Sequence, residues 1–319
     1  MAPIDDLARV LSDTTRIGLD ADLAKALRIA DEDVTRARLR AQINDGRGPV
    51  SIHLLGAWVK DCRDAIGKGE VYWWSIPMVA RTNGAVQWDP LCGLPSGAPP
   101  FSVGNESWLE SISLKDPPLL GVVSQEDDIA AAVIHLAFYE DDWAPAVLAP
   151  ALKAGMTALA ENTAPAANAD ALVKPVREPI WTSLKAKQDD FMIEEDVKFL
   201  RKEGLGFGAG LVTALLNQYI RVYVFAKDVE RTESAGPYSL AKGQEQRVLF
   251  PSSLEGGGRV VVFSRGKVRV DPFGELNVDA PYIAHVIEDR QEAALAEGVT
   301  ISAEEEAGVV AYYTPPRAS

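Results

Sequence analysis

Clusters of acidic residues between apolar runs are the most coherent chemical pattern of this sequence. One cluster lies on either side of residue 65, and two others flank the apolar run 129–138. Calcium takes about six to eight oxygen ligands, and carboxylates on loops at the end of a sheet supply them without strict spacing. If the flanking strands are antiparallel neighbours, the first and last clusters meet at one end of a sheet. The pattern predicts a calcium site formed by Asp61, Asp64, Glu70, Glu140, Asp141 and Asp142, with solvated surface acids as the alternative.

Motifs for catalysis are not found in the sequence. His53 and His135 lie inside apolar runs, where a histidine is most often a hydrogen-bonded core residue, and His285 is the only other imidazole. No serine lies in a GxSxG elbow, and no HExxH zinc motif occurs. The glycine-rich segment 204–210 lacks the GK[ST] ending of a phosphate loop, so it is interpreted as a helix break or a close packing contact. These observations favour a non-enzymatic protein and leave open a catalytic set assembled from distant residues.

Composition excludes several classes of partner. The 319 residues include 32 basic and 46 acidic side chains, so the formal net charge of −14 repels phosphate backbones and predicts that nucleic acid is not a partner. The N-terminus has acids where a secretory signal has basic residues, which predicts a cytoplasmic protein and leaves export by another route open. Cys62 and Cys92 are too few for a disulfide scaffold and are predicted to be free thiols, although their spacing does not exclude a bridge.

A segment with an approximate second copy organises the chain. Residues 50–79 contain an apolar run, a Lys-Asp pair, a charged loop with glycine and a tyrosine that opens a further apolar run, and residues 219–240 repeat this order. The tyrosine follows the aspartate at similar spacing in both copies, Asp61 to Tyr72 and Asp228 to Tyr238. The repetition predicts one strand-loop-strand unit that is used twice, each copy opening its own sheet structure.

Hydrophobic periodicity supplies the remaining elements. Residues 129–138 form a nearly continuous apolar run, typical of a strand buried on both faces, and Asn83-Gly84 predicts a hairpin turn. Residues 89–105 are rich in proline and glycine and predict a loop, and residues 189–217 predict mostly helix. The expected fold is mainly β with helical additions (α+β), with two antiparallel β-sandwich modules joined by a helical segment. The predicted parts are an N-terminal helical segment 1–48, a first β-sandwich module 49–165, a helical connector 166–218 and a second β-sandwich module 219–319.

Two stretches, VKDCRDAIGKGEVY and FYEDDW, together resemble the C-two type β-sandwich that binds calcium and phospholipid. The resemblance implies that Asp61, Glu70, Glu140 and Asp142 are calcium ligands. The Asp-Pro-Tyr motif of that family is Glu70-Val71-Tyr72 here, and the second copy has Gly236-Pro237-Tyr238 without the acid, which implies a structural role for the second module.

The sequence leaves three functional hypotheses open. The leading one is a non-enzymatic binding or assembly protein, assisted by calcium, that contacts a protein partner or further copies of itself, with membrane contact only through calcium. A glycosidase-like hydrolase is the first alternative and needs paired carboxylates such as Asp127 or Asp141 with a distant histidine. A membrane-inserting, toxin-like protein is the second, with residues 204–226 as the inserting element, although alternating polar residues within that window favour a strand.

Overall fold

The computed structural model describes residues 50–62, 67–88, 96–115, 117–123, 128–140, 150, 154–155, 158–159, 165–184, 191–200, 212–251, 258–271, 285–286 and 298–315. Its elements are β1 (Val50–Val59), β2 (Gly69–Arg81), β3 (Val86–Gln87), β4 (Ser96–Val103), β5 (Ser107–Trp108), β6 (Leu119–Val123), β7 (Ile129–Glu140), α5 (Ala169–Leu184), β8 (Phe191–Leu200), β9 (Val212–Leu216), β10 (Ile220–Asp228), β11 (Glu233–Leu240), β12 (Glu245–Val248), β13 (Arg259–Arg265), β14 (Val268–Asp271), β15 (His285–Val286), β16 (Val299–Ala303) and β17 (Ala307–Thr314).

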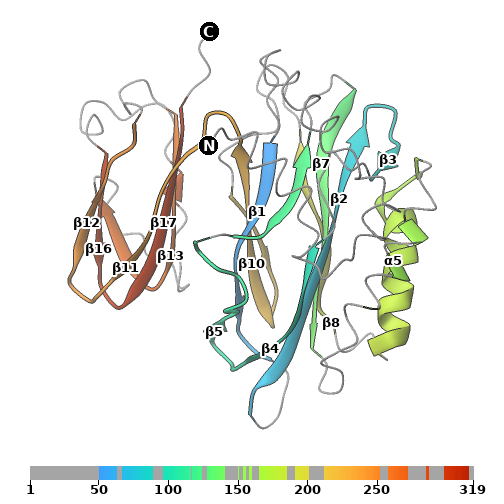
Figure 1. The fold of residues 1–319 in the computed structure, drawn as a ribbon, viewed down its shortest axis with the longest axis horizontal. Helices are drawn as coiled ribbons and strands as arrows, with labels where there is room; N and C mark the ends of the chain where they lie inside the picture. Colours follow the sequence, from blue (N-terminus) through green and yellow to red (C-terminus); the bar gives the residue numbers. More distant parts are fainter. Residues whose placement is uncertain are drawn as a thin grey trace.

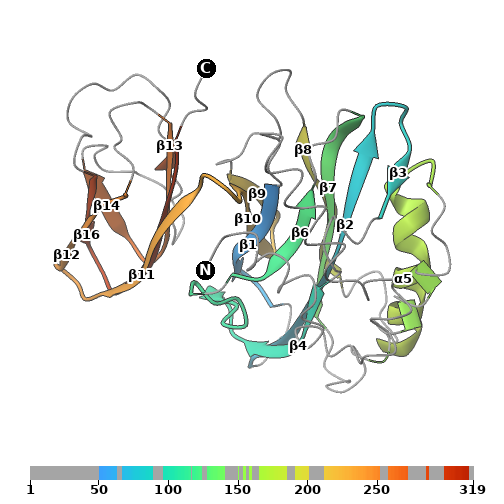
Figure 2. The ribbon, with the colours of Figure 1, turned by 45° about the horizontal axis from the view of Figure 1, so that its top comes forward.

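The described residues form four antiparallel sheets, which are stacked in layers with helix α5 (Figure 1). Strands β3-β2-β7-β8, with β4 beside β2, form the helix-side sheet, which α5 covers. Strands β5-β1-β10-β9, with β6 beside β1, form the central sheet (Figure 2). Strands β11-β17-β13-β15 form the facing sheet, and β12-β16-β14 form the outer sheet. The predicted mainly β, antiparallel fold with a helical addition is therefore confirmed.

Each pair of neighbouring layers encloses its own hydrophobic core. The helix-side and central sheets pack as the first sandwich, and the facing and outer sheets pack as the second. Strand β7 is buried along nearly its whole length, because alternate residues serve different cores. Ile134, Leu136 and Phe138 pack against the central sheet, whereas Val133, Ala137 and Tyr139 pack beneath α5. The prediction of a strand buried on both faces is confirmed.

Helix α5 is stabilised by its packing on the helix-side sheet. The side chain of Asn168 accepts a hydrogen bond from the backbone N–H of Ala171 at 2.9 Å, in the manner of a helix cap. Leu172, Val176 and Ile180, at helical spacing, are buried against the sheet. Pro175 and Pro179 lie inside the helix, and each interior proline removes a backbone hydrogen bond. Burial of the apolar face therefore has to compensate for the weakened helix.

Three sequence predictions about secondary structure differ from the structure. Residues 191–200 and 212–216, predicted to be helical, form β8 and β9, because the neighbouring strands β7 and β10 supply their hydrogen-bond partners. Residues 96–103, predicted to lie in a loop, form β4 beside β2 despite their prolines. The helical connector 166–218 is thus a helix that covers a sheet, followed by two strands. The Asn83-Gly84 turn is confirmed, since Gly84 has a φ of 85° and β2 pairs with β3 across it.

The two copies of the predicted strand-loop-strand unit do not open separate sandwiches. Strand β10 pairs with β1 in antiparallel register, from Val50 opposite Asp228 to Val59 opposite Ile220. The first strand of each copy, β1 or β10, therefore belongs to the central sheet of the first sandwich. The prediction that the second module begins at residue 219 is wrong for β10. After their loops the two copies diverge: β2 enters the helix-side sheet, and β11 enters the facing sheet. Residues 1–48, predicted to be helical, lie outside the described residues.

In the part of the chain that the structure describes, no helix is both long enough and apolar enough to cross a membrane. In the window 204–226, which the sequence offered as an inserting element, residues 220–226 belong to β10. Their alternate side chains, Ile220, Val222, Val224 and Ala226, are fully buried in the core of the first sandwich.

Candidate functional site

The predicted calcium ligands are only partly within the described residues. Asp64, Asp141 and Asp142 lie outside them. Asp61 is exposed just beyond the end of β1, and Glu70 and Glu140 lie in β2 and β7.

The two loops of the predicted calcium site start from the same end of the first sandwich, as expected for antiparallel neighbours. Val71 lies opposite Glu140 in the antiparallel pair of β2 and β7. A Cβ placed on Gly69 would lie 2.9 Å from Cβ of Cys62 and 3.3 Å from Cγ of Glu140, so the end of β1 and the end of β7 both contact Gly69. The end of β1 and the end of β7 therefore lie close together at this end of the sandwich.

Strand alternation nevertheless separates two of the predicted ligands. The side chain of Glu140 lies on the face of Gly69 and Val71, toward the central sheet, and Glu70 lies on the opposite face with Tyr72. These two carboxylates therefore do not share one ion. Among the described residues, no group of three or more His, Cys, Asp or Glu side chains is placed to hold a metal.

A cluster of charged residues does form elsewhere, where β7, β8 and α5 meet. His135 of β7 is buried, and its Nδ1 donates a hydrogen bond to Oδ1 of Asp196 on β8 at 3.0 Å. Its Nε2 lies 3.3 Å from Oε1 of Glu194, also on β8, as an ion pair. The indole of Trp74, on β2, lies against the imidazole with ring centres 5.1 Å apart. The imidazole is thus held between two carboxylates and beside an aromatic ring.

Arg177 connects this cluster to the helix. One guanidinium nitrogen donates to Glu194 at 3.0 Å, and another donates to Asp170, also on α5, at 3.0 Å. The guanidinium also lies over the ring of Trp181, 5.1 Å from its centre. When His135 is protonated, the series Asp170, Arg177, Glu194, His135 and Asp196 therefore alternates in charge from α5 onto strands β8 and β7. We call these five residues the His135 cluster.

Burial and charge act in opposite directions on the groups of the cluster. Burial favours the neutral imidazole, but Asp196 and Glu194 outweigh it and raise the pKa of His135 above 6.5. Burial also opposes ionisation of Glu194, but His135 and Arg177 together lower its pKa. Arg177 has a raised pKa, since Glu194 and Asp170 overcome its partial burial. The geometry thus stabilises the fully charged form of the cluster.

The arrangement does not suit metal binding or base catalysis. Glu194 and Asp196 contact different nitrogens of the imidazole, so a single ion cannot be bound by all three side chains. Nδ1 is hydrogen-bonded to Asp196, Nε2 lies 3.3 Å from Glu194, and the residue is 6% exposed, which leaves no lone pair accessible to a substrate. The cluster is therefore suited to holding β8 and α5 in place.

Sequence reasoning had identified only one member of this cluster. His135 was interpreted as a core histidine with a hydrogen bond, and the structure agrees. Glu194 and Asp196 were missed because their segment was predicted to be helical. The alternation of Asp196 and Lys198 with the apolar residues Val197 and Phe199 was the available signal for a strand.

The ion pairs of Arg177 provide a test of the cluster. Arg177→Met is expected to lower the free energy of unfolding by about 1–2 kcal/mol, because it removes two charge-assisted hydrogen bonds from a partly buried group. Lys174→Met is the matched control on the same helix, since the Lys174–Glu178 pair is exposed and is expected to contribute less than about 0.5 kcal/mol. Urea unfolding measures both variants. Equal losses for the two variants would contradict a stabilising role for the cluster.

A second histidine contact resembles a nucleophile and its base but is not accessible. Oγ of Ser51 lies 2.8 Å from Nε2 of His53, two residues further along β1. Ser51 is only 3% exposed, so its hydroxyl is shielded from a substrate. Asp127 and Asp141, named for the hydrolase alternative, lie outside the described residues.

The junction between the two sandwiches is apolar at its centre. Side chains of the central sheet meet those of the facing sheet in one buried cluster, formed by Leu55, Leu114, Tyr223, Phe225, Val261, Phe263, Val310 and Tyr312, with Trp108 packed against it. Gly56 permits this contact, because a Cβ there would lie 2.8 Å from the ring of Trp108 and 2.9 Å from that of Phe263. Interfaces between domains are usually more polar than this, so the junction is typical of two modules that behave as one body.

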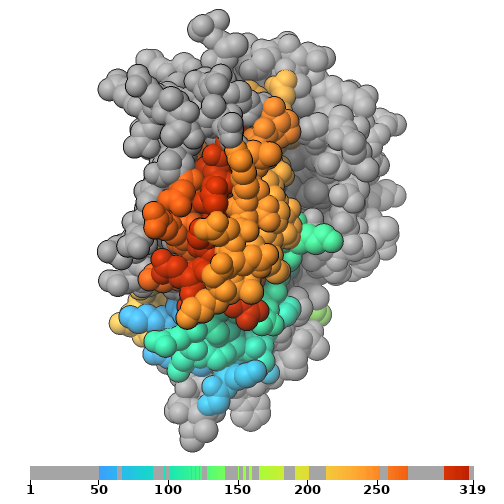
Figure 3. All heavy atoms as spheres, turned by 90° about the vertical axis from the view of Figure 1, so that its left-hand side faces the viewer, coloured from blue at the N-terminus to red at the C-terminus, as the bar shows by residue number. Residues whose placement is uncertain are grey.

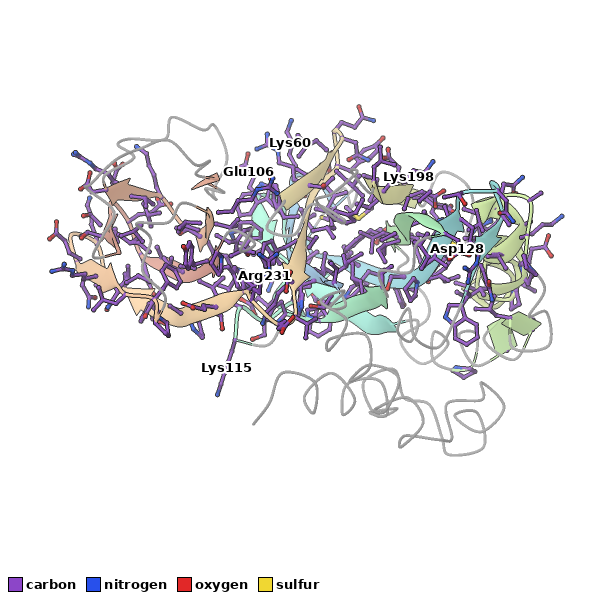
Figure 4. The ribbon with its side chains drawn as sticks, turned by 90° about the horizontal axis from the view of Figure 1, so that it is seen from above. Lys60, Glu106, Lys115, Asp128, Lys198 and Arg231 are labelled. Atoms are coloured by element: carbon purple, nitrogen blue, oxygen red, sulfur yellow. The ribbon has the colours of Figure 1, made fainter. Side chains whose placement is uncertain are left out.

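Polar contacts flank the apolar junction. Arg265 of β13 donates a hydrogen bond to the carbonyl of Ile112 and lies over the ring of Trp108, and burial lowers its pKa to about 10. Figure 3 shows residues of the second sandwich, orange and red, bordering green residues of the first. On the linker from β10 to β11, Arg231, labelled in Figure 4, pairs with Asp228 at 2.8 Å and donates to the carbonyl of Pro315 at 2.8 Å.

The fold and these contacts define a mainly β protein of stacked antiparallel sheets with one face covered by a helix. No model of a known protein family matches the chain, and a search of curated proteins gives no significant match.

Proposed function

We propose that this chain is a non-enzymatic β-sandwich protein that works as an assembly component and contacts further copies of itself through its surface. The observation that carries the proposal is the position of β8 at the edge of the helix-side sheet. Among the described strands, β8 pairs with β7 alone, at the end of the helix-side sheet. Glu195 and Lys198 are exposed, and Leu200 is 66% exposed. An accessible edge strand is a template for adding another strand.

The edge formed by β11 differs from that formed by β8. Strand β11, at the edge of the facing sheet, contains Pro237 and a register shift between Ala235 and Tyr238, two features that block strand addition. The regular part of β8, from Ile193 to Leu200, contains neither. Contrast between the two edges supports β8 as the contact strand.

Charge complementarity supports a second copy as the occupant. If two β8 strands pair antiparallel about a twofold axis at Val197, Asp196 of each copy lies opposite Lys198 of the other. Opposite charges directly across a strand pair contribute roughly 0.2–1 kcal/mol each. The apolar junction between the sandwiches adds to the argument, because a rigid two-module body holds its contact surfaces at constant spacing.

Sedimentation velocity over a range of protein concentrations tests the proposal. The wild-type chain is expected to associate as concentration rises, and Leu200→Glu is expected to weaken association at least about tenfold, since it places an unpaired charge at the new strand pair. Leu249→Glu is the matched control, because Leu249 is 61% exposed and lies outside β8. A single monomeric species at every concentration overturns the proposal, as does equal weakening by the two variants.

Calcium belongs to the same proposal as an assisting ligand at the loops of the first module. Its support is that Asp61 and Glu140 both lie at the end of the sandwich where those loops start. Glu140→Gln is expected to weaken calcium binding roughly tenfold, and Glu70→Gln to leave it unchanged, since Glu70 lies on the other face of the sheet. Titration calorimetry measures both. Heats equal to dilution for the wild-type chain would remove calcium from the proposal and leave self-association to be judged by sedimentation.

A further inference from the structure

The His135 cluster has one property that the proposed function does not use. Its central residue is a histidine, the side chain whose charge changes nearest to neutral pH. The two carboxylates that contact it, Glu194 and Asp196, both come from β8. On β2, the residue beside the imidazole is Trp74, which carries no charge, and from α5 Arg177 approaches through Glu194, with Asp170 on the other side of its guanidinium. The imidazole thus faces two negative groups, and the nearby positive group is already bound to one of them.

We propose that His135 is a pH-operated latch, which fixes β8 and the docked helix α5 to the helix-side sheet while its imidazole is protonated and loosens them when the proton is lost. In the protonated form the Nδ1–H donates to Asp196, and Nε2 lies 3.3 Å from Oε1 of Glu194 as an ion pair without hydrogen-bond geometry. In the neutral form one nitrogen presents a lone pair to a carboxylate, and Asp196 loses its described cationic partner. Glu194 keeps Arg177, so the effect falls most strongly on the contact between β7 and β8.

The direction of the pH dependence follows from linkage. The folded protein binds the proton of His135 more tightly than the unfolded chain does, because the pKa is raised above 6.5. The stabilisation is therefore complete below pH 6.5 and is lost as the pH rises through the raised value. At low pH, protonation of Glu194 would remove its contribution to the latch. Because the pKa of Glu194 is lowered, this loss occurs only when the pH falls below the usual range of a carboxyl group.

Hydrogen exchange and urea unfolding at a series of pH values test the latch. On going from pH 6 to a pH above the titration of His135, the folded-to-unfolded ratio of the wild-type chain is expected to fall about tenfold for each unit by which the pKa exceeds 6.5. Backbone amides of β8 and α5 are expected to lose protection over the same range, after correction for intrinsic exchange. His135→Gln is expected to remove this dependence, and Glu195→Gln, an exposed carboxylate on the same strand, is expected to retain it.

A second variant keeps the test decisive if His135→Gln does not fold. Asp196→Asn removes one of the two charges that hold the proton, so the imidazole is expected to titrate at lower pH in NMR spectra than it does in the wild-type chain. Titration of the wild-type imidazole at or below pH 6.5 overturns the latch, as does an unchanged titration in Asp196→Asn. The readout is independent of self-association, because it is measured at concentrations where the chain is monomeric and on amides of α5 as well as β8.

Discussion

Phe263→Ala is expected to lower the free energy of unfolding by about 3–5 kcal/mol and to split a single thermal transition into two. Phe263 is fully buried in the cluster that joins the central and facing sheets, with ring centres 5.6 Å from Trp108 and 6.0 Å from Tyr223. Truncation leaves a cavity at the centre of the junction and removes the largest apolar group that the second sandwich contributes there. The second sandwich is then expected to unfold at a lower temperature than the first, as calorimetry measures.

The control for this prediction is an apolar residue outside the junction. Leu249→Ala is expected to change stability by less than about 0.5 kcal/mol, since the side chain is 61% exposed. Small-angle scattering gives a second readout, because uncoupled modules increase the average size of the particle. One transition at an unchanged temperature in Phe263→Ala would show that the junction does not couple the sandwiches.

Asp228→Ala is expected to have the second largest effect, a loss of about 2–4 kcal/mol in the free energy of unfolding. Asp228 is 3% exposed at the end of β10, where its carboxylate accepts hydrogen bonds from the backbone N–H groups of Glu230 and Arg231 at 3.1 and 3.0 Å. The same carboxylate accepts two bonds from the guanidinium of Arg231, at 3.0 and 2.8 Å. Removal leaves the turn donors and the guanidinium without this acceptor, at the point where the chain passes from one sandwich to the other.

Two further variants separate the turn from the ion pair. Asp228→Asn keeps an oxygen acceptor for the turn and is expected to lose less stability than the alanine variant. Asp271→Ala is the exposed comparison, because its pair with Arg269, 3.2 Å long, has both side chains more than 40% exposed and is expected to contribute less than about 1 kcal/mol. Equal losses for Asp228→Ala and Asp271→Ala in urea unfolding would contradict a special role for the linker.

Several elements were predictable because their signals are local. The doubly buried strand β7 follows from an unbroken apolar run, since a strand between two cores needs apolar residues at both odd and even positions. The turn between β2 and β3 follows from Asn83-Gly84, because few other residues adopt a positive φ at low cost.

Other elements depended on partners far away in the sequence. Strand β8 carries Glu194, Glu195 and Asp196 in succession, a pattern that local propensity assigns equally well to a helix, and pairing with β7 decides the matter. Of the predicted calcium ligands, the approach of Glu140 to the end of β1 was foreseen from strand pairing. The placement of Glu70 on the opposite face was not, because a one-residue difference in position changes the face of a strand.

The sequence by itself determined that the protein is rich in antiparallel strands, where its tightest turns lie and which strand is buried on both sides, because these depend on the chemistry of neighbouring residues. Only the tertiary structure decided that β1 and β10 lie side by side, that the two sandwiches share an apolar junction, and that His135 meets Glu194 and Asp196. The physical reason is that such contacts depend on which apolar faces bury each other, and many pairings of similar strands satisfy the same local pattern.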